Sequence, residues 1–141
     1  MQYAEYQVGA VLHAGPYTVT EPEILAFARQ WDPQWFHTQP EAAKTGPFEG
    51  LIASGWHTCS IAMRLAVDAF LGDSESYVSP GLDNIRWLHP VRPGDTLRLA
   101  ITVVEKRTTK AGLGLLRWDW EMANQNGDLV LEIKAANLFK I

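Results

Sequence analysis

The chain has 141 residues, of which 47% are hydrophobic and 20% charged, and its formal net charge is −4. These values are typical of one ordinary globular domain, so we expect a single domain over residues 1–141. A negatively charged chain without a basic stripe has little to neutralise phosphates with, and we expect no nucleic-acid partner.

The cysteine content and the first residues bear on the compartment. The single cysteine, Cys59, excludes an internal disulfide and a multi-cysteine zinc site, which fits a reducing environment. Residues 1–10 contain no basic start followed by an apolar run, so no secretory signal is visible. We therefore expect a cytoplasmic protein.

A first helix is expected to follow Thr20. Thr20 and Glu23 have the spacing of a capping box. The helix should end near Trp31, because Asp32 precedes Pro33 and the residue before a proline is pushed out of the helical region. This pattern predicts that Asp32 lies at a helix exit.

A second, weaker capping-box spacing joins Thr38 to Glu41. It predicts a helix of one or two turns over residues 40–44. His37 immediately precedes this segment, so we expect its side chain in a pinned loop.

Residues 51–71 predict one long central helix. Almost every residue in this stretch is apolar or small, and Gly72 follows where a helix usually stops. Because the apolar residues go round all sides, we expect the helix to be buried by its surroundings. His57, Arg64 and Asp68 interrupt the stretch, which argues against a membrane span.

The second half of the chain has the pattern of an antiparallel meander. Apolar and polar residues alternate with a period of two, as in half-buried strands, and Asn126-Gly127 is a strong hairpin signal. The expected strands cover residues 82–88, 96–103, 115–122 and 129–138, with a turn of type II character at 92–95 and a shorter β-prone run at 17–20.

This order of elements predicts an α+β protein with the hot-dog fold, in which an antiparallel sheet wraps one long, buried central helix. A helix of ~19 residues is ~28 Å long, and a twisted sheet of roughly five strands can enclose it. An open edge strand remains in this arrangement. We therefore expect a homodimer or a higher even oligomer.

Asp32 and His37 are the candidate catalytic pair. Histidine titrates near neutrality, so a carboxylate and an imidazole five residues apart could hold one water molecule and exchange a proton with it. The spacing alone also allows a structural interpretation, in which Asp32 caps a backbone N–H and His37 packs beneath aromatic neighbours.

Gly55 marks a candidate site for a ligand carbonyl. Free N–H groups around Ala53, Ser54 and Gly55 would carry the positive end of the helix dipole, and Gly55 has no side chain to keep a carbonyl away. The alternative for Gly55 is close packing of the helix against a strand. The histidines show no metal-ligand spacing, and we expect no metal site.

Three segments carry a family resemblance: DPQWFH at residues 32–37, AKTGPFEGLIASG at residues 43–55, and PVRPGDTL at residues 90–97. In this order, over roughly residues 15–140, they resemble the MaoC-like acyl dehydratases, relatives of the (R)-specific enoyl-CoA hydratases. The resemblance implies a dimeric hot-dog enzyme of fatty acid metabolism that reversibly adds water to a 2-enoyl thioester of coenzyme A or of a carrier protein. Coenzyme A would then be part of the substrate, with no separate cofactor.

Position by position, the resemblance assigns Asp32 and His37 as the catalytic acid/base pair and Gly55 as the amide that receives the thioester carbonyl. Ala53 and Ser54, beside Gly55, are expected to contact the substrate. Two alternatives remain. One is a hot-dog acyl-CoA thioesterase, a class of enzyme that usually has a lone Asp or Glu on the central helix or the facing strand. The other is a non-catalytic acyl-binding subunit.

Overall fold

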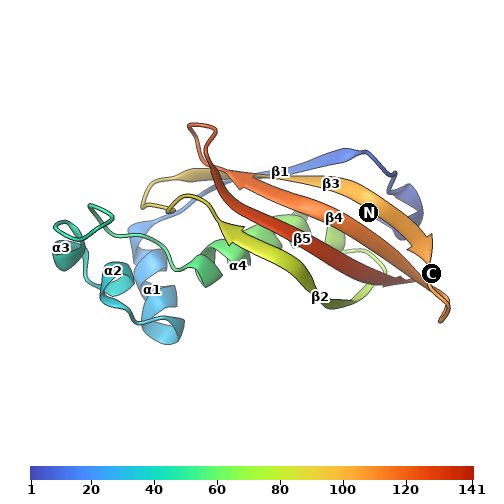
Figure 1. Cartoon of the computed structure of the whole chain (residues 1–141), viewed down its shortest axis with the longest axis horizontal. Coiled ribbons are helices and arrows are strands. Elements are labelled where there is room, and N and C mark those ends of the chain that lie inside the picture. Colours follow the sequence, from blue (N-terminus) through green and yellow to red (C-terminus); the bar gives the residue numbers. More distant parts are fainter.

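Five antiparallel strands form one sheet, and this computed structural model describes the whole chain, residues 1–141 (Figure 1). The strands are β1 (Val11–Thr18), β2 (Ser76–Trp87), β3 (Thr96–Thr108), β4 (Leu113–Ala123) and β5 (Leu129–Lys140), in the order β1-β3-β4-β5-β2. The helices are α1 (Glu21–Trp31), α2 (Trp35–Thr38), α3 (Pro40–Ala43) and α4 (Gly55–Ala66), with a 3-10 turn η1 (Tyr3–Glu5) and a π-helical turn η2 (Val67–Leu71) that continues α4.

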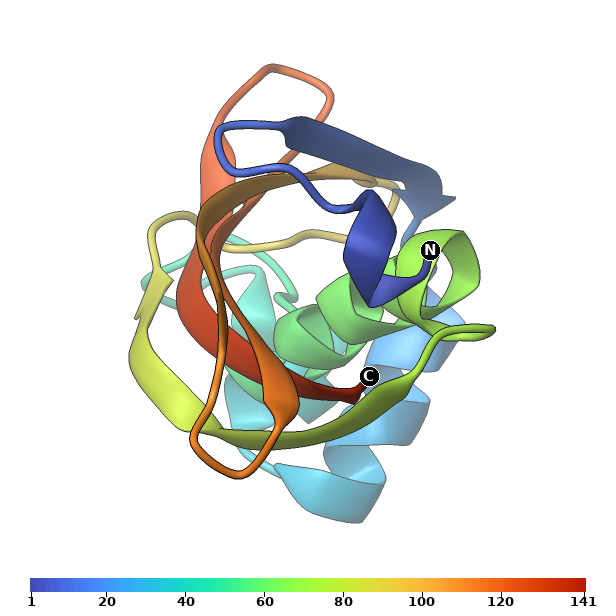
Figure 2. The ribbon, with the colours of Figure 1, turned by 90° about the vertical axis from the view of Figure 1, so that its right-hand side faces the viewer.

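The sheet curls around α4, as the view along the helix shows (Figure 2). Strands β3, β4 and β5 form the middle of the sheet, and their inward side chains meet one face of α4 in a single hydrophobic core. Buried members of this core include Leu99, Ile101, Trp118, Met122 and Leu131 from the sheet, and Ile61, Ala62 and Leu65 from α4. The predicted hot-dog arrangement is confirmed.

The central helix starts later than the sequence predicts, at Gly55 instead of Leu51. Residues 51–54 are extended because their backbone groups bond to other segments. The N–H of Ile52 donates to the carbonyl of Phe36 (3.2 Å), and that of Ala53 donates to the carbonyl of Val91 (2.8 Å). This extended segment ties α2 to the loop after β2, on either side of the helix start.

The burial of α4 is one-sided in the single chain. Ile61 and Ala62 are 4% and 0% exposed, whereas Trp56 and Met63 on the opposite face are 59% and 47% exposed. The expectation that the helix is enclosed on every side is therefore wrong for the isolated chain. Strand β2, at the sheet edge beside this face, is also largely exposed.

The first predicted capping box is present. The N–H of Thr20 donates to Glu23 Oε1 (2.6 Å), and that of Glu23 donates to Thr20 Oγ1 (3.4 Å). Helix α1 ends at Trp31, with Asp32 as the residue that follows it, as predicted.

The second predicted capping box is absent. Thr38 Oγ1 donates to the carbonyl of Gln34 (3.0 Å), and Gln39, which precedes α3, makes no side-chain cap. Thr38 instead closes α2, a single turn that the sequence pattern did not reveal. His37 therefore lies within this turn and not in a loop.

The strands of the meander occur where predicted but are longer. Strand β2 begins six residues before the expected start, and β3 runs five residues past the expected end. The turn over residues 92–95 is present: the N–H of Asp95 donates to the carbonyl of Arg92 (3.1 Å), and Gly94 has φ +88°, as the third position of a type II turn requires. None of the helices combines the length and apolar character that a membrane crossing needs.

Candidate active site

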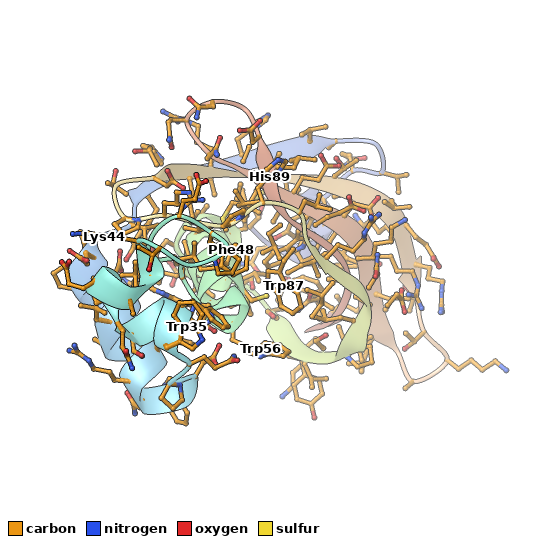
Figure 3. The ribbon with its side chains drawn as sticks, turned by 60° about the vertical axis from the view of Figure 1, so that its left-hand side comes forward. Trp35, Lys44, Phe48, Trp56, Trp87 and His89 are labelled. Carbon is orange, nitrogen blue, oxygen red and sulfur yellow. The ribbon has the colours of Figure 1, made fainter.

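A cavity of about 450 Å³ lies where the first turn of α4 faces α2 and the segment after β2. Asp32, His37 and Gly55 all line it, so the structure brings together three of the residues predicted as site residues. Figure 3 looks onto this side of the molecule, where Trp56 and Trp87 lie at the exposed side of the cavity. Residues far apart in the sequence thus form one pocket.

The carboxylate of Asp32 and the ring of His37 converge in this cavity. Asp32 Oδ2 lies 3.3 Å from His37 Nε2, and the two side chains are 18% and 6% exposed. The other ring nitrogen, Nδ1, lies 2.7 Å from the carbonyl oxygen of Ile52. The extended segment before α4 therefore fixes the orientation of the imidazole.

This orientation decides which ring nitrogen carries a proton in neutral His37. A carbonyl oxygen only accepts, so Nδ1 must donate to Ile52, and the lone pair of Nε2 faces the carboxylate of Asp32. In neutral His37, Nε2 and the carboxylate of Asp32 are therefore two acceptors on the same side of the pair. A water molecule beside them can donate one O–H to each.

Asp32 is kept as a carboxylate by neutral donors. Gln34 Nε2 donates to Oδ1 and Ser54 Oγ donates to Oδ2, both at 2.8 Å. Desolvation by itself raises the pKa of Asp32, but these two hydrogen bonds, together with the positive charge of His37 when its ring is protonated, outweigh it and the net shift of the pKa is downward. The acid therefore stays ionised and able to accept a hydrogen bond.

Ser54 and Ala53, the two residues expected to contact the substrate beside Gly55, differ in their access to the cavity. Ser54 is 0% exposed and its hydroxyl is committed to Asp32, so it positions the carboxylate. Ala53 lines the cavity, but its N–H is already bonded to the carbonyl of Val91. The expectation of a free N–H at residue 53 is wrong, because that residue is extended chain and not the helix start.

Gly55 combines a free N–H at the helix start with close packing against a neighbouring segment. Its N–H, in the first turn of α4, donates no hydrogen bond within the chain and belongs to a residue that lines the cavity. The indole of Trp87 packs directly on its Cα: an added Cβ would lie 2.7 Å from the ring, and Trp87 Nε1 donates to the carbonyl of Gly55 (2.9 Å). Close packing thus requires glycine where the helix opens.

Several groups at the site were not identified from the sequence. Trp56 and Trp87 pack edge to face, with ring centroids 5.5 Å apart. His89 lines the cavity with its Nδ1 bonded to the carbonyl of Leu129 (2.9 Å). Gln34 is recognisable in the sequence as an amide two residues after Asp32, but nothing in the local pattern joins Trp87 or His89 to residues 32–37.

His57 lies outside this cavity and is buried against α1. Its ring stacks on Phe27, with centroids 4.8 Å apart and an interplanar angle of 9°, and its Nδ1 is buried without a hydrogen-bond partner. Desolvation lowers the pKa of His57. His57 therefore packs against α1 and lies apart from the candidate site.

Potential metal ligands do not gather anywhere in the chain: no three His, Cys, Asp or Glu side chains come close enough together to hold an ion. The polar groups that line the cavity include Asp32, His37, the start of α4 and His89. This donor and acceptor set suits the handling of a water molecule beside a carbonyl group.

The fold and the site define a class of protein. A hot-dog sheet packs on one face of a helix, and the N-terminus of that helix shares a cavity with a carboxylate–imidazole pair. The chain belongs to the MaoC-like domain family, whose profile matches residues 5–114.

Similar proteins cover the chain at full or partial length. It is 30% identical over 141 residues to the uncharacterized protein YdeM of Bacillus subtilis, covering 99% of both chains. It is 33% identical over 89 residues to 3-hydroxyacyl-thioester dehydratase Z of Mycobacterium tuberculosis, covering 62% of this chain and 59% of that protein. The crystal structure of a MaoC-like dehydratase from Rhodospirillum rubrum superposes with a TM-score of 0.89 at 33% identity, covering 97% of this chain and 94% of the other.

Proposed function

We propose that this protein is an acyl-thioester hydratase or dehydratase, a hydro-lyase that reversibly adds water to the double bond of a 2-enoyl thioester. The observation that supports this most is the 3.3 Å approach of Asp32 Oδ2 to His37 Nε2 in the cavity that Gly55 also lines. A lone pair on each of the two atoms gives one water molecule two acceptors. The name of the dehydratase from Mycobacterium tuberculosis describes the reverse of this reaction.

In the proposed mechanism, His37 and Asp32 activate the water together. One O–H proton passes to Nε2 of His37, and the ionised Asp32 stabilises the imidazolium that forms. The water oxygen forms a bond to C3 of the enoyl group, while the π electrons of the C2–C3 double bond move toward the thioester carbonyl.

Gly55 receives the charge that develops on the carbonyl oxygen. Its free N–H and the positive end of α4 stabilise the enolate-like oxygen, an effect commonly worth about 2.7–4 kcal/mol for one donor. The imidazolium then returns a proton to C2, which completes the addition of H and OH. Dehydration follows the same steps in reverse.

Neither a metal nor a separate organic cofactor takes part in this proposal. Coenzyme A or a carrier protein enters as part of the substrate, and the cytoplasm remains the proposed compartment. The apolar residues of the cavity wall, among them Phe48, Ile52 and Val91, suit an acyl group.

A homodimer is part of the proposal. Leu82 on edge strand β2 and Met63 on the neighbouring face of α4 are each 47% exposed, and Trp56 and Trp87 beside the cavity are 59% and 45% exposed. Strand β2 also has a row of backbone groups without a neighbouring strand. A second copy pairing along β2 would cover both this edge and the open face of α4.

The decisive experiment follows the enoyl absorbance of crotonyl-CoA with the purified protein, beside an assay for free thiol. Loss of the enoyl signal without thiol release supports a hydratase. Thiol release would indicate an acyl-CoA thioesterase. The absence of both, together with measurable binding of the thioester, would indicate a non-catalytic acyl-binding subunit.

A further inference from the structure

A second cavity lies beside the catalytic one, between α4 and the sheet, on the side where the proposed second copy would pair along β2. Its volume is about 200 Å³, and eight of its ten lining residues are hydrophobic. They include Cys59 and Met63 from α4, Leu82 and Ile85 from β2, and Ile133 and Ala135 from β5. Such a surface suits an alkyl chain and offers little to a charged ligand.

Trp56 is the one residue that lines both cavities. It follows Gly55 directly in the first turn of α4, so its indole stands next to the amide proposed to hold the thioester carbonyl. The two cavities therefore lie against the same side chain. An acyl chain that starts at Gly55 would have to pass this indole to enter the second cavity.

The indole of Trp56 has a fixed neighbour. It meets the ring of Trp87 edge to face, with an interplanar angle of 78°. Trp87 is itself held by the bond from its Nε1 to the carbonyl of Gly55 (2.9 Å) and by its contact with the Cα of that residue. Figure 3 shows the two tryptophans together, one from α4 and the other from the end of β2. Trp56 therefore packs against a side chain that is itself held in place.

We propose that Trp56 separates the catalytic cavity from the second cavity and so restricts the enzyme to short 2-enoyl thioesters. This specificity rests on the proposed hydratase function. Trp56 acts by excluding carbon atoms from an apolar space, and it takes no part in the addition of water. Removing its side chain joins the two cavities and admits a longer chain.

The test compares kcat/KM for 2-enoyl-CoA substrates of four, six, eight and ten carbon atoms. The wild-type protein is expected to prefer the four-carbon substrate. Each methylene that becomes buried strengthens binding by about fourfold, so three methylenes beyond Trp56 correspond to roughly 60-fold. Trp56→Ala is therefore expected to raise the ten-carbon to four-carbon ratio of kcat/KM by at least about tenfold.

Two variants control this comparison. Trp35 on α2 is an exposed tryptophan on the same side of the molecule that lines neither cavity, and Trp35→Ala should leave the ratio unchanged. Ala135 lines the second cavity from β5, and the double variant Trp56→Ala/Ala135→Leu should lose most of the gain, because the added side chain fills the new space. Trp56→Leu replaces Trp56→Ala if the smaller side chain prevents folding.

The outcomes separate this inference from the proposed function. A wild type that hydrates crotonyl-CoA but prefers ten carbons, or a folded Trp56→Ala variant with an unchanged ratio, overturns the role of Trp56. A wild type that hydrates no enoyl-CoA overturns the function instead. Calorimetric binding of butyryl-CoA and decanoyl-CoA then decides the role of Trp56: a tenfold gain for decanoyl-CoA in Trp56→Ala supports it, and equal affinity contradicts it.

Discussion

The hydroxyl of Ser54 donates a hydrogen bond of 2.8 Å to Asp32 Oδ2, across 22 residues of sequence. Ser54 precedes the first residue of α4, where a serine usually accepts a hydrogen bond from the helix backbone, yet it makes no such cap. The backbone at the start of α4 therefore has no side-chain cap from Ser54, and the carboxylate of Asp32 has the Ser54 hydroxyl as a hydrogen-bond donor. This bond links the geometry of α4 to the protonation of Asp32.

Ser54→Ala is expected to lower kcat/KM by about tenfold or more, because a hydrogen bond to a charged group contributes about 1.5–3 kcal/mol. Loss of the donor also raises the pKa of Asp32 from its lowered value, since one of the bonds that favour the ionised form is gone. In a carbon-13 NMR titration, the carboxyl group of Asp32 should therefore titrate at a higher pH in Ser54→Ala than in the wild type. Ser60→Ala, on an exposed face of α4, is the matched control. An unchanged titration of Asp32 in Ser54→Ala would show that the Ser54 hydroxyl does not favour the ionised form.

Asp32→Asn and His37→Ala should each reduce turnover by about 10²–10⁴-fold, because each removes one acceptor for the attacking water. Circular dichroism and the melting temperature should show an intact fold, with the larger change expected for the buried His37. Turnover close to that of the wild type in either variant would mean that the water is held by other groups.

Gly55→Ala should destabilise the protein by about 1–3 kcal/mol, although alanine is the better helix former. The reason is the 2.7 Å separation between an added Cβ and the indole of Trp87. Chemical denaturation measures the loss. In a double-mutant cycle with Trp87→Ala, the penalty of Gly55→Ala should largely disappear, and additive penalties would contradict the proposed clash.

The stability of the fold should depend on pH through His57. The pKa of His57 is lowered in the folded state relative to the usual value of 6.5, so the unfolded chain binds more protons between these two values. The free energy of unfolding should therefore be highest above about pH 6.5 and fall as the pH drops through this window, by up to about 1.4 kcal/mol per pH unit. Denaturation curves between pH 5 and 8 should show this slope in the wild type and a smaller one in His57→Phe. Equal slopes would assign the dependence to another group.

Leu82→Asp should weaken the proposed homodimer, because it places a charge on the exposed edge strand β2, where Leu82 is 47% exposed. Val11→Asp is the matched control on the opposite edge strand β1, where Val11 is 51% exposed. Sedimentation equilibrium should give a higher dissociation constant for Leu82→Asp alone. A monomeric wild type, or weakening by Val11→Asp only, would refute pairing along β2.

Local patterns were sufficient for much of the fold. The capping box at Thr20, the proline after Asp32 and the turn around Gly94 depend on bonds between residues a few positions apart, and all three are present. The start of α4 was misplaced because residues 51–54 are as apolar as the helix that follows. Their extended form depends on backbone bonds to Phe36 and Val91, and no local pattern contains those partners.

The sequence by itself determined the kind of elements, their order, and the presence of Asp32, His37 and Gly55 near one helix start, because hydrophobic period, capping and turn chemistry act over short stretches of chain. The tertiary structure decided which groups hold them: Ser54 on the carboxylate, Ile52 on the imidazole, and Trp87 on the glycine. These bonds join segments that become neighbours when the sheet closes around α4. Their geometry therefore depends on the packing of the whole chain.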